Sequence, residues 1–154
     1  MAILGNMKPF IPIESPNDVL PIVRGYFNRP QENFLVLTLD GAHHFLRLHH
    51  VTKGLVNKTI IHPREVFYPV IKDLASAVIL VHNHPSGSAC PSDEDKEISE
   101  RMCMVASILG ISLLDHVIIA KGGSFYSFRS SGKLSQSYDK ADLIKFLPSL
   151  RSCV

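Results

Sequence analysis

The chain has 154 residues, of which 45% are hydrophobic and 19% are charged, and its net charge is +2. These values are typical of one globular domain and exclude a disordered chain, which combines low hydrophobicity with high net charge. The sequence shows no secretory signal, no CxxC cysteine pair and no apolar run near the roughly 18 residues of a membrane helix, so a cytoplasmic protein without membrane contact is expected.

Apolar spacing and turn residues predict strands and helices that alternate along the chain. The expected elements are helix 18–27, strands 32–39 and 44–51, a short strand 59–61, helix 64–75, strand 77–82, helix 92–109, strands 111–120 and 125–128, and a short helix 142–147. Pro21 fits only a first helical turn, so the first helix is expected to begin near Asp18, and Pro69 should kink or shorten the second. The pattern indicates an α/β fold, a mixed β-sheet flanked by helices.

Residues 15–130 are expected to form the domain, with an N-terminal extension at 1–14 and a polar, basic C-terminal tail at 131–154. After Ala120 the chain carries six basic residues against two acidic ones, which would allow a weak contact with DNA. A solvated tail is the simpler interpretation, because the basic residues form no dense run and have no aromatic residues interleaved among them. The oligomeric state is not indicated.

The sequence motif richest in chemistry begins at His82, directly after the apolar run 77–81. His82 and His84 are spaced i, i+2 at a strand end, so both imidazoles project to one face and can reach one metal ion. Asp95, eleven residues further on, completes a three-ligand set. Three protein ligands with a fourth position open to water are typical of a catalytic zinc site.

Ser92 and Asp95 also have a structural interpretation. Ser-x-x-Asp before an apolar helix is close to a capping box, with Ser92 as N-cap and Asp95 at the third helical position. The two interpretations are compatible, because an N-cap hydroxyl at the positive end of a helix can still face a cleft. For Asp95 the position relative to the two histidines favours a metal ligand.

The motif at residues 82–95 resembles that of a known protein family. His82, His84, Pro85, Ser92 and Asp95 match the signature of the JAMM (MPN+) zinc metalloprotease family at every spacing. The surrounding sequence resembles the RadC family more closely still, over about residues 15–130. The segments that carry this likeness are His-Asn-His-Pro-Ser-Gly at 82–87, Pro-Ser-x-x-Asp at 91–95, Asp-His-Val-Ile at 115–118, Gly-Leu at 54–55 and His-Pro-Arg-Glu-Val-Phe at 62–67.

The resemblance implies a zinc hydrolase with a cytidine-deaminase-like α/β/α fold and a glutamate upstream of the histidines as general base. Two candidates exist, Glu32 at the start of the first strand and Glu65 at a helix start, and the order of elements in the JAMM family favours Glu32. Glu32 would take the proton of a zinc-activated water and pass it to a leaving amine, while Ser92 would donate a hydrogen bond to the oxyanion. A peptide or isopeptide substrate is implied by the family.

Two other functions remain open. Some relatives of this fold act as scaffolds, so a zinc site without proteolysis is one alternative, and a factor associated with DNA repair is another. RadC proteins usually carry a helix-hairpin-helix module that suggests DNA contact, and these 154 residues leave no room for it. Among the other histidines, His116 is a candidate for a supporting position beside the site, whereas the four at positions 43, 44, 49 and 50 are expected to face solvent.

Overall fold

The computed structural model describes residues 10–53 and 61–135, and its centre is a five-stranded sheet in the order β2-β1-β3-β4-β5. The strands are β1 (Asn33–Leu39), β2 (Phe45–Lys53), β3 (Ala77–His84), β4 (Ser112–Ala120) and β5 (Phe125–Ser127). β3 and β4 are parallel, and the other neighbouring pairs are antiparallel. The predicted mixed α/β sheet is therefore confirmed.

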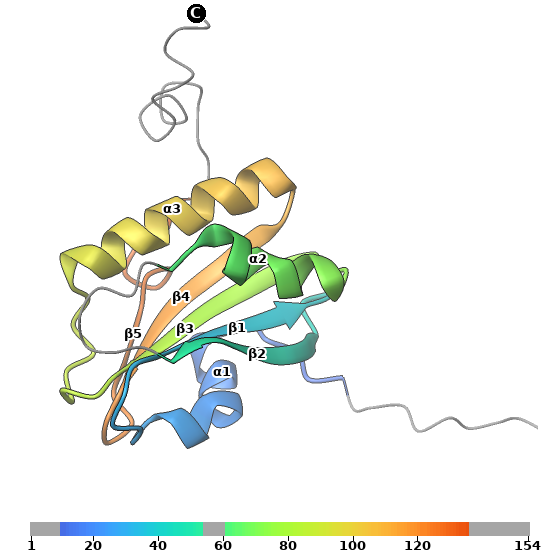
Figure 1. Cartoon of the computed structure of the whole chain (residues 1–154). Helices are drawn as coiled ribbons and strands as arrows, with labels where there is room; N and C mark the ends of the chain where they lie inside the picture. The colour runs from blue at the N-terminus through green and yellow to red at the C-terminus, as the bar shows by residue number, and fades with distance from the viewer. Residues whose placement is uncertain (1–9, 54–60, 136–154) are drawn as a thin grey trace, which may run out of the picture.

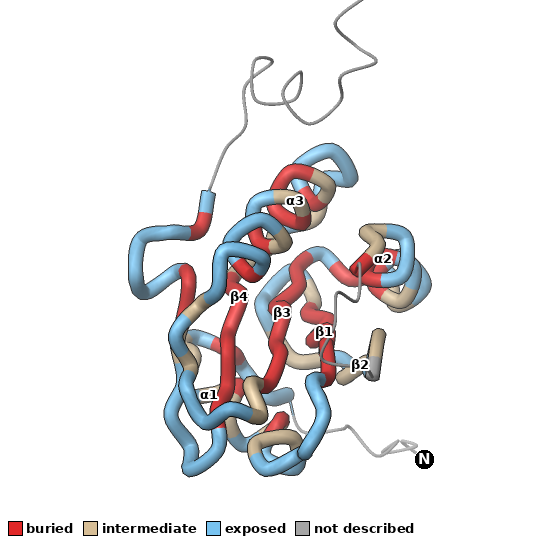
Figure 2. Tube along the Cα trace, turned by 60° about the vertical axis from the view of Figure 1, so that its left-hand side comes forward, coloured by how far each residue is buried: buried red, intermediate tan, exposed pale blue. Residues whose placement is uncertain are grey.

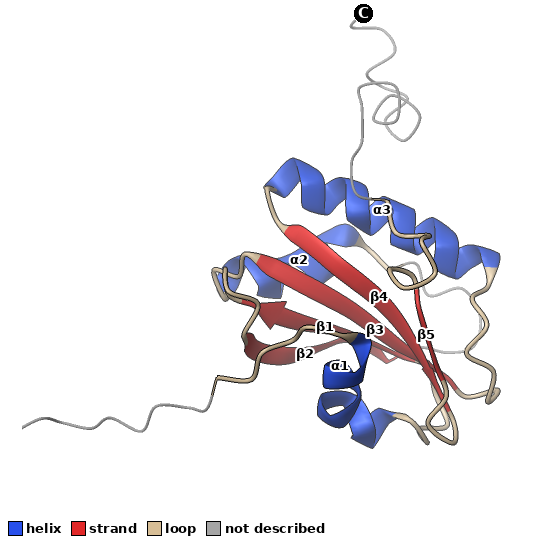
Figure 3. Ribbon diagram, turned by 180° about the vertical axis from the view of Figure 1, so that it is seen from behind, coloured by secondary structure: helices blue, strands red, loops and turns tan. Residues whose placement is uncertain are grey.

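Helices cover both faces of this sheet (Figures 1 and 3). The helices are α1 (Pro16–Val23), which continues into the 3-10 turn η1 (Arg24–Tyr26), α2 (Pro63–Lys72) and α3 (Asp93–Leu109). α1 packs on one face, and α2 and α3 lie side by side on the other. The three layers are thus helix, sheet and helices.

The core lies on both sides of the two central strands. Every residue of β1 is buried, and all but the last of β3, as the run of red along the middle of Figure 2 shows. Alternate side chains of one strand therefore enter two different cores. Leu35, Leu37 and Ile79 face α1, whereas Val36, Val78 and Leu80 face α2 and α3. This alternation decides which face each residue at the end of β3 will occupy.

Proline positions explain two differences from the expected helices. α1 begins at Pro16, two residues earlier than expected, because Pro16 occupies the first helical turn and Ser15 forms a capping box with Asp18. Pro21 consequently lies inside the helix rather than in its first turn, so that expectation was wrong. α2 contains Pro69 and ends at Lys72, three residues short of the expected end, with Leu74 in the left-handed region at φ 52°. Loss of the Pro69 N–H hydrogen bond accounts for a short helix.

The packed part of the chain is longer at both ends than the range 15–130. Ile13 is buried against the α1 face, and Pro12 forms an isolated bridge with His44. Leu134 is buried in a cluster with Cys103 and Phe128. The expected strand 59–61 falls mostly outside the described residues, and the expected helix 142–147 falls wholly outside them. In the part of the chain that the structure describes, no helix has the length and apolar character of a membrane span.

A buried carboxylate, Asp73, joins the end of α2 to the sheet. Its Oδ2 accepts a hydrogen bond of 2.7 Å from the hydroxyl of Thr38, which is fully buried, and lies 2.6 Å from His49 Nε2. Burial alone would raise the pKa of Asp73, but the hydrogen bonds from His49 and Thr38 outweigh it and lower that pKa. The expectation that His49 simply faces solvent was therefore wrong, because its alternation with apolar residues did not reveal a partner 24 residues away.

Replacing Asp73 with asparagine is expected to lower the free energy of unfolding at pH 7 by about 1–3 kcal/mol, since a buried hydroxyl and an imidazole lose a charged acceptor. A carboxyl whose folded pKa is lowered stabilises the fold above its unfolded pKa of about 3.9 and loses this effect as pH falls through the folded value. The difference between parent and variant should therefore shrink below about pH 4. Urea unfolding of the parent and the variant at several pH values measures this difference in the free energy of unfolding. Glu97→Gln, which removes an exposed pair with Arg101, is the control and should change stability by less than about 0.5 kcal/mol.

Candidate metal centre

Three side chains from two elements meet at the carboxyl end of β3. His82 and His84 stand on the same face of β3, the face covered by α2 and α3, because strand residues two apart point the same way. β3 and β4 are parallel and α3 connects them, so the N-terminus of α3 begins at the end of β3 that carries the histidines. Asp95, the third residue of α3, therefore reaches both rings (Figure 1 shows the elements).

The separations within this cluster suit a single small metal ion. His82 Nε2 lies 2.9 Å from His84 Nε2 and 3.0 Å from Asp95 Oδ1, and His84 Nε2 lies 3.3 Å from Asp95 Oδ2. Ligand atoms bound to one tetrahedral zinc ion at about 2.0–2.1 Å are about 3.3 Å apart, so the donors need to move by only a few tenths of an ångström. Two imidazoles and one carboxylate are a donor set that zinc accepts. Among the described residues, these three form the group that could hold a metal ion.

Asp95 is both a helix-capping residue and a member of the cluster. The Ser92 N–H donates to Asp95 Oδ2 at 2.7 Å, and the Asp95 N–H donates to Ser92 Oγ at 3.1 Å, which completes the capping box. The capping and chemical interpretations of this pair are therefore compatible in geometry. The Ser92 side chain accepts one hydrogen bond and is exposed, so its hydroxyl can still donate outward.

Charge and hydrogen bonding set the protonation of the side chains that could bind a metal. Burial would raise the pKa of Asp95, but hydrogen bonds with His82 and His84 outweigh it and hold that pKa well below its ordinary range, so the carboxylate is ionised. The hydrogen bond to Asp95 raises the pKa of His84 despite partial burial. His84 Nδ1 lies 2.9 Å from the Ser88 carbonyl oxygen and donates to it, so loss of the Nε2 proton that bonds Asp95 would leave a lone pair on Nε2 for a metal.

The loop between β3 and α3 turns sharply to place Ser88 beneath His84. The Gly87 N–H donates to the His84 carbonyl at 3.2 Å, and Gly87 has φ 88°. A side chain at this position would be strained in the left-handed region, so glycine is required by the backbone rather than by space.

His116 lies directly behind His82. Its Nε2 is 2.9 Å from His82 Nδ1, and the residue is fully buried between the sheet and α3. Burial, and then the proximity of His82, lower the pKa of His116 well below its ordinary value, so its ring is neutral. The supporting position that the sequence suggested for His116 thus has a direct contact in the structure.

Glu32 lies beside His84 at the start of β1. Phe34 pairs with His82 in the antiparallel ladder, and continuing this register by two residues would place Glu32 level with His84 and on the same face. Its charge contributes to the raised pKa of His84, and its side chain is exposed. Glu65 is exposed in the first turn of α2, where an acid interacts favourably with the helix dipole. Of the two glutamates, the one beside the cluster is Glu32.

Asn83, between the two histidines, holds the segment that carries Glu32, and sequence reasoning missed it. Its side chain is completely buried on the opposite face of β3. Oδ1 accepts from the Asn33 N–H at 2.7 Å, and Nδ2 donates to the Gln31 carbonyl at 3.0 Å. The amide therefore fixes the backbone on both sides of Glu32. The sequence does contain one indication of this role. Asn83 stands at the end of a buried strand, in a position where an apolar residue would ordinarily pack.

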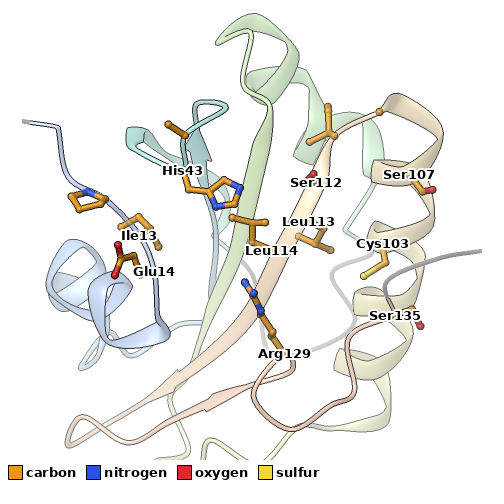
Figure 4. Close-up of a pocket in the computed structure, with 14 residues that line it drawn as sticks. Ile13, Glu14, His43, Cys103, Ser107, Ser112, Leu113, Leu114, Arg129 and Ser135 are labelled. Atoms are coloured by element: carbon orange, nitrogen blue, oxygen red, sulfur yellow. The ribbon is translucent and has the colours of Figure 1, made fainter.

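A separate pocket of about 660 Å³ lies away from this cluster (Figure 4). It is lined by residues at the start of β4, including Leu113 and Leu114, together with His43, Cys103 and Arg129. None of the three cluster residues lines it. The start of β4 is opposite the sheet end that carries His82 and His84, because β3 and β4 run parallel. This pocket and the candidate metal centre are therefore distinct.

Comparison with known proteins shows one family. A family model described as a RadC-like JAB domain matches residues 13–133. A UPF0758 protein from Geobacter sulfurreducens is 49% identical over 107 residues, which make up 70% of this chain and 46% of the relative. A UPF0758 protein from Methanospirillum hungatei is 45% identical over 129 residues, 82% of this chain and 57% of the relative. The chain thus spans about half the length of the curated relatives it matches.

Proposed function

The chain belongs to the RadC-like JAB domain family, and from this membership and the metal centre we propose that it is a zinc-dependent hydrolase of peptide or isopeptide bonds. The observation that carries the proposal is the convergence of His82, His84 and Asp95, with Nε2 and carboxylate oxygens 2.9–3.3 Å apart. A mixed sheet with helices on both faces is consistent with a JAB-type domain.

His82, His84 and Asp95 would hold the metal, and the fourth tetrahedral position would remain open. When bound, zinc supplies a Lewis acid that makes a water molecule nucleophilic near neutral pH. The side chains of His82, His84 and Asp95 are only 7–13% exposed, so the protein excludes most bulk water from the ligand atoms. Weak dielectric screening there strengthens the interaction of any charge with the centre.

Glu32 is proposed as the general base and Ser92 as the oxyanion donor. Glu32 lies on the same face as His84 and close enough to affect its charge, so its carboxylate can accept the proton of the attacking water and deliver it to the leaving amine. Ser92 Oγ is fixed by the Asp95 N–H, so its hydroxyl is oriented before substrate arrives. The proton that leaves the water ends on the amine, and Glu32 is regenerated.

The experiment is zinc analysis of the purified protein followed by a screen of peptide and isopeptide substrates, with and without a chelator. About one zinc ion per chain and hydrolysis that the chelator abolishes and added zinc restores are expected. Stoichiometric zinc without hydrolysis of any amide substrate would support the alternative, a module whose zinc site is not used for proteolysis. Three of the six basic residues that suggested DNA contact, Lys140, Lys145 and Arg151, lie outside the described residues.

Asn83→Ala is expected to lower turnover about ten- to a hundredfold while leaving zinc content unchanged, because the segment 31–33 loses its anchor and Glu32 is misplaced. Zinc stoichiometry and kcat, measured on the same preparation, test this. Asn28→Ala changes an exposed asparagine just before the segment 31–33, and it should alter neither zinc stoichiometry nor kcat. Unchanged kcat in Asn83→Ala would contradict the positioning role.

A further inference from the structure

His82 has its second ring nitrogen against another imidazole, and this contact has a consequence for metal binding. If His82 Nε2 is to offer its lone pair to a metal, the ring proton must be on Nδ1. Nδ1 lies 2.9 Å from His116 Nε2, so the His82 N–H donates and His116 must accept through Nε2. His116 therefore carries its own proton on Nδ1. The two tautomers are fixed together.

We propose that His116 is a positioning residue that holds His82 in the tautomer and ring orientation required for zinc. The inference rests on the proposed function only in so far as His82 is a metal ligand. A metal-bound histidine ordinarily donates its other N–H to a carboxylate, carbonyl or water, and that acceptor orients the ring. Here a buried neutral imidazole takes that place.

The ring of His116 is itself held from several directions. Phe128 stacks on it with ring centroids 4.9 Å apart and an interplanar angle of 7°, and the Phe128 N–H donates to the His116 carbonyl at 3.0 Å. Asp115 accepts from the His116 N–H at 2.7 Å and from the Arg129 N–H at 3.0 Å. The Asp115 carboxylate therefore binds the backbone directly after Phe128 to β4. Such a ring has little freedom to rotate away from His82.

The other ring nitrogen of His116, Nδ1, has no hydrogen-bond partner in the part of the chain that the structure describes. Among the described buried side chains, His116 Nδ1 and Ser99 Oγ are the polar atoms without a hydrogen-bond partner. The contact with His82 Nδ1 is therefore the one hydrogen bond of the His116 side chain to another described residue.

A neutral partner also suits the chemistry of the centre. Zinc with two neutral imidazoles and one carboxylate keeps one net positive charge, which favours ionisation of a bound water. A carboxylate at position 116 would offset part of that charge at a buried site. An imidazole orients His82 equally well without doing so.

The test measures zinc affinity by competition with a chelator, in His116→Leu, His116→Gln and Leu80→Ala. Leucine cannot accept the His82 N–H, and affinity is expected to fall about ten- to a hundredfold. The amide oxygen of glutamine can accept it, and affinity is expected to stay within about threefold of the parent. Leu80→Ala removes buried volume beside His116 without touching a polar group, so it should lower the unfolding midpoint but leave zinc affinity nearly unchanged.

Cobalt substitution gives a second measure that does not depend on turnover. The visible spectrum of the cobalt protein should change in His116→Leu and match the parent in His116→Gln, because the orientation of His82 sets the coordination geometry. If His116→Leu does not fold, His116→Met takes its place as an apolar side chain of adaptable shape.

Parent-like zinc affinity and cobalt spectrum in the apolar variant would overturn the inference, as would an equal loss of affinity in Leu80→Ala or in His116→Gln. A parent protein that binds zinc but hydrolyses nothing would instead count against the proposed function and leave the role of His116 standing. A parent that binds no zinc would overturn both.

Discussion

Zinc content is expected to fall from about one ion per chain to a small residue when His82 or Asp95 is replaced by alanine. Each change removes one of three protein ligands, and two ligands cannot hold the ion against dilution. Inductively coupled plasma analysis after dialysis measures the loss. His50→Ala, which removes an exposed histidine of β2, should retain the metal and serves as the matched control.

Thermal unfolding separates loss of a ligand from loss of structure. A ligand that binds only the folded state stabilises it, so added zinc should raise the unfolding midpoint of the parent and of His50→Ala but not of His82→Ala or Asp95→Ala. Asp95→Ala also loses the capping box with Ser92, and its metal-free form should be about 1 kcal/mol less stable than the parent. Full retention of zinc by either alanine variant would refute the ligand assignment.

Glu32→Gln is expected to bind zinc as the parent does and to lose about two to four orders of magnitude in kcat. Glutamine keeps the size and hydrogen-bonding capacity of the side chain but cannot accept a proton. Steady-state kinetics with the substrate found in the screen, together with zinc analysis of the same sample, measures both effects.

Glu65→Gln is the control because it changes an exposed glutamate in the first turn of α2. It should alter neither kcat nor zinc content. If Glu65→Gln loses activity and Glu32→Gln does not, the roles assigned to the two glutamates must be exchanged.

Local sequence patterns were sufficient to predict the strands and the cluster of His82, His84 and Asp95 that could hold a metal. The apolar run before His82 predicts a buried strand, and the two-residue spacing then places His82 and His84 on one face whatever surrounds them. The capping pattern of Ser92 and Asp95 predicts where α3 begins, and α3 begins there. These features depend only on neighbours within a few residues, so they can be predicted from the sequence.

Interactions across long sequence separations were not predictable in the same way. Asp73 and His49 are 24 residues apart, and Asn83 and Asn33 are 50 apart, so their pairing depends on the sheet order. The interior position of Pro21 in α1 shows tertiary packing overriding a local preference. The burial of Leu134 depends on a pocket formed by Phe128 and Cys103, which a polar sequence context does not reveal.

The bond between Asn83 and the backbone of β1 makes sheet register a condition of the chemistry. A strand that slips by one residue against its neighbour turns every side chain to the other face. Such a slip of β1 along β3 would carry Glu32 to the α1 side of the sheet, away from His84, while leaving the histidines and Asp95 where they are. The cluster of His82, His84 and Asp95 would then remain intact without the proposed base beside it. Because Asn83 Oδ1 accepts both the backbone and the side-chain N–H of Asn33, at 2.7 and 3.1 Å, the slipped arrangement would leave a buried amide without partners. The same amide thus discriminates against an arrangement of the strands that the proposed mechanism predicts to be inactive.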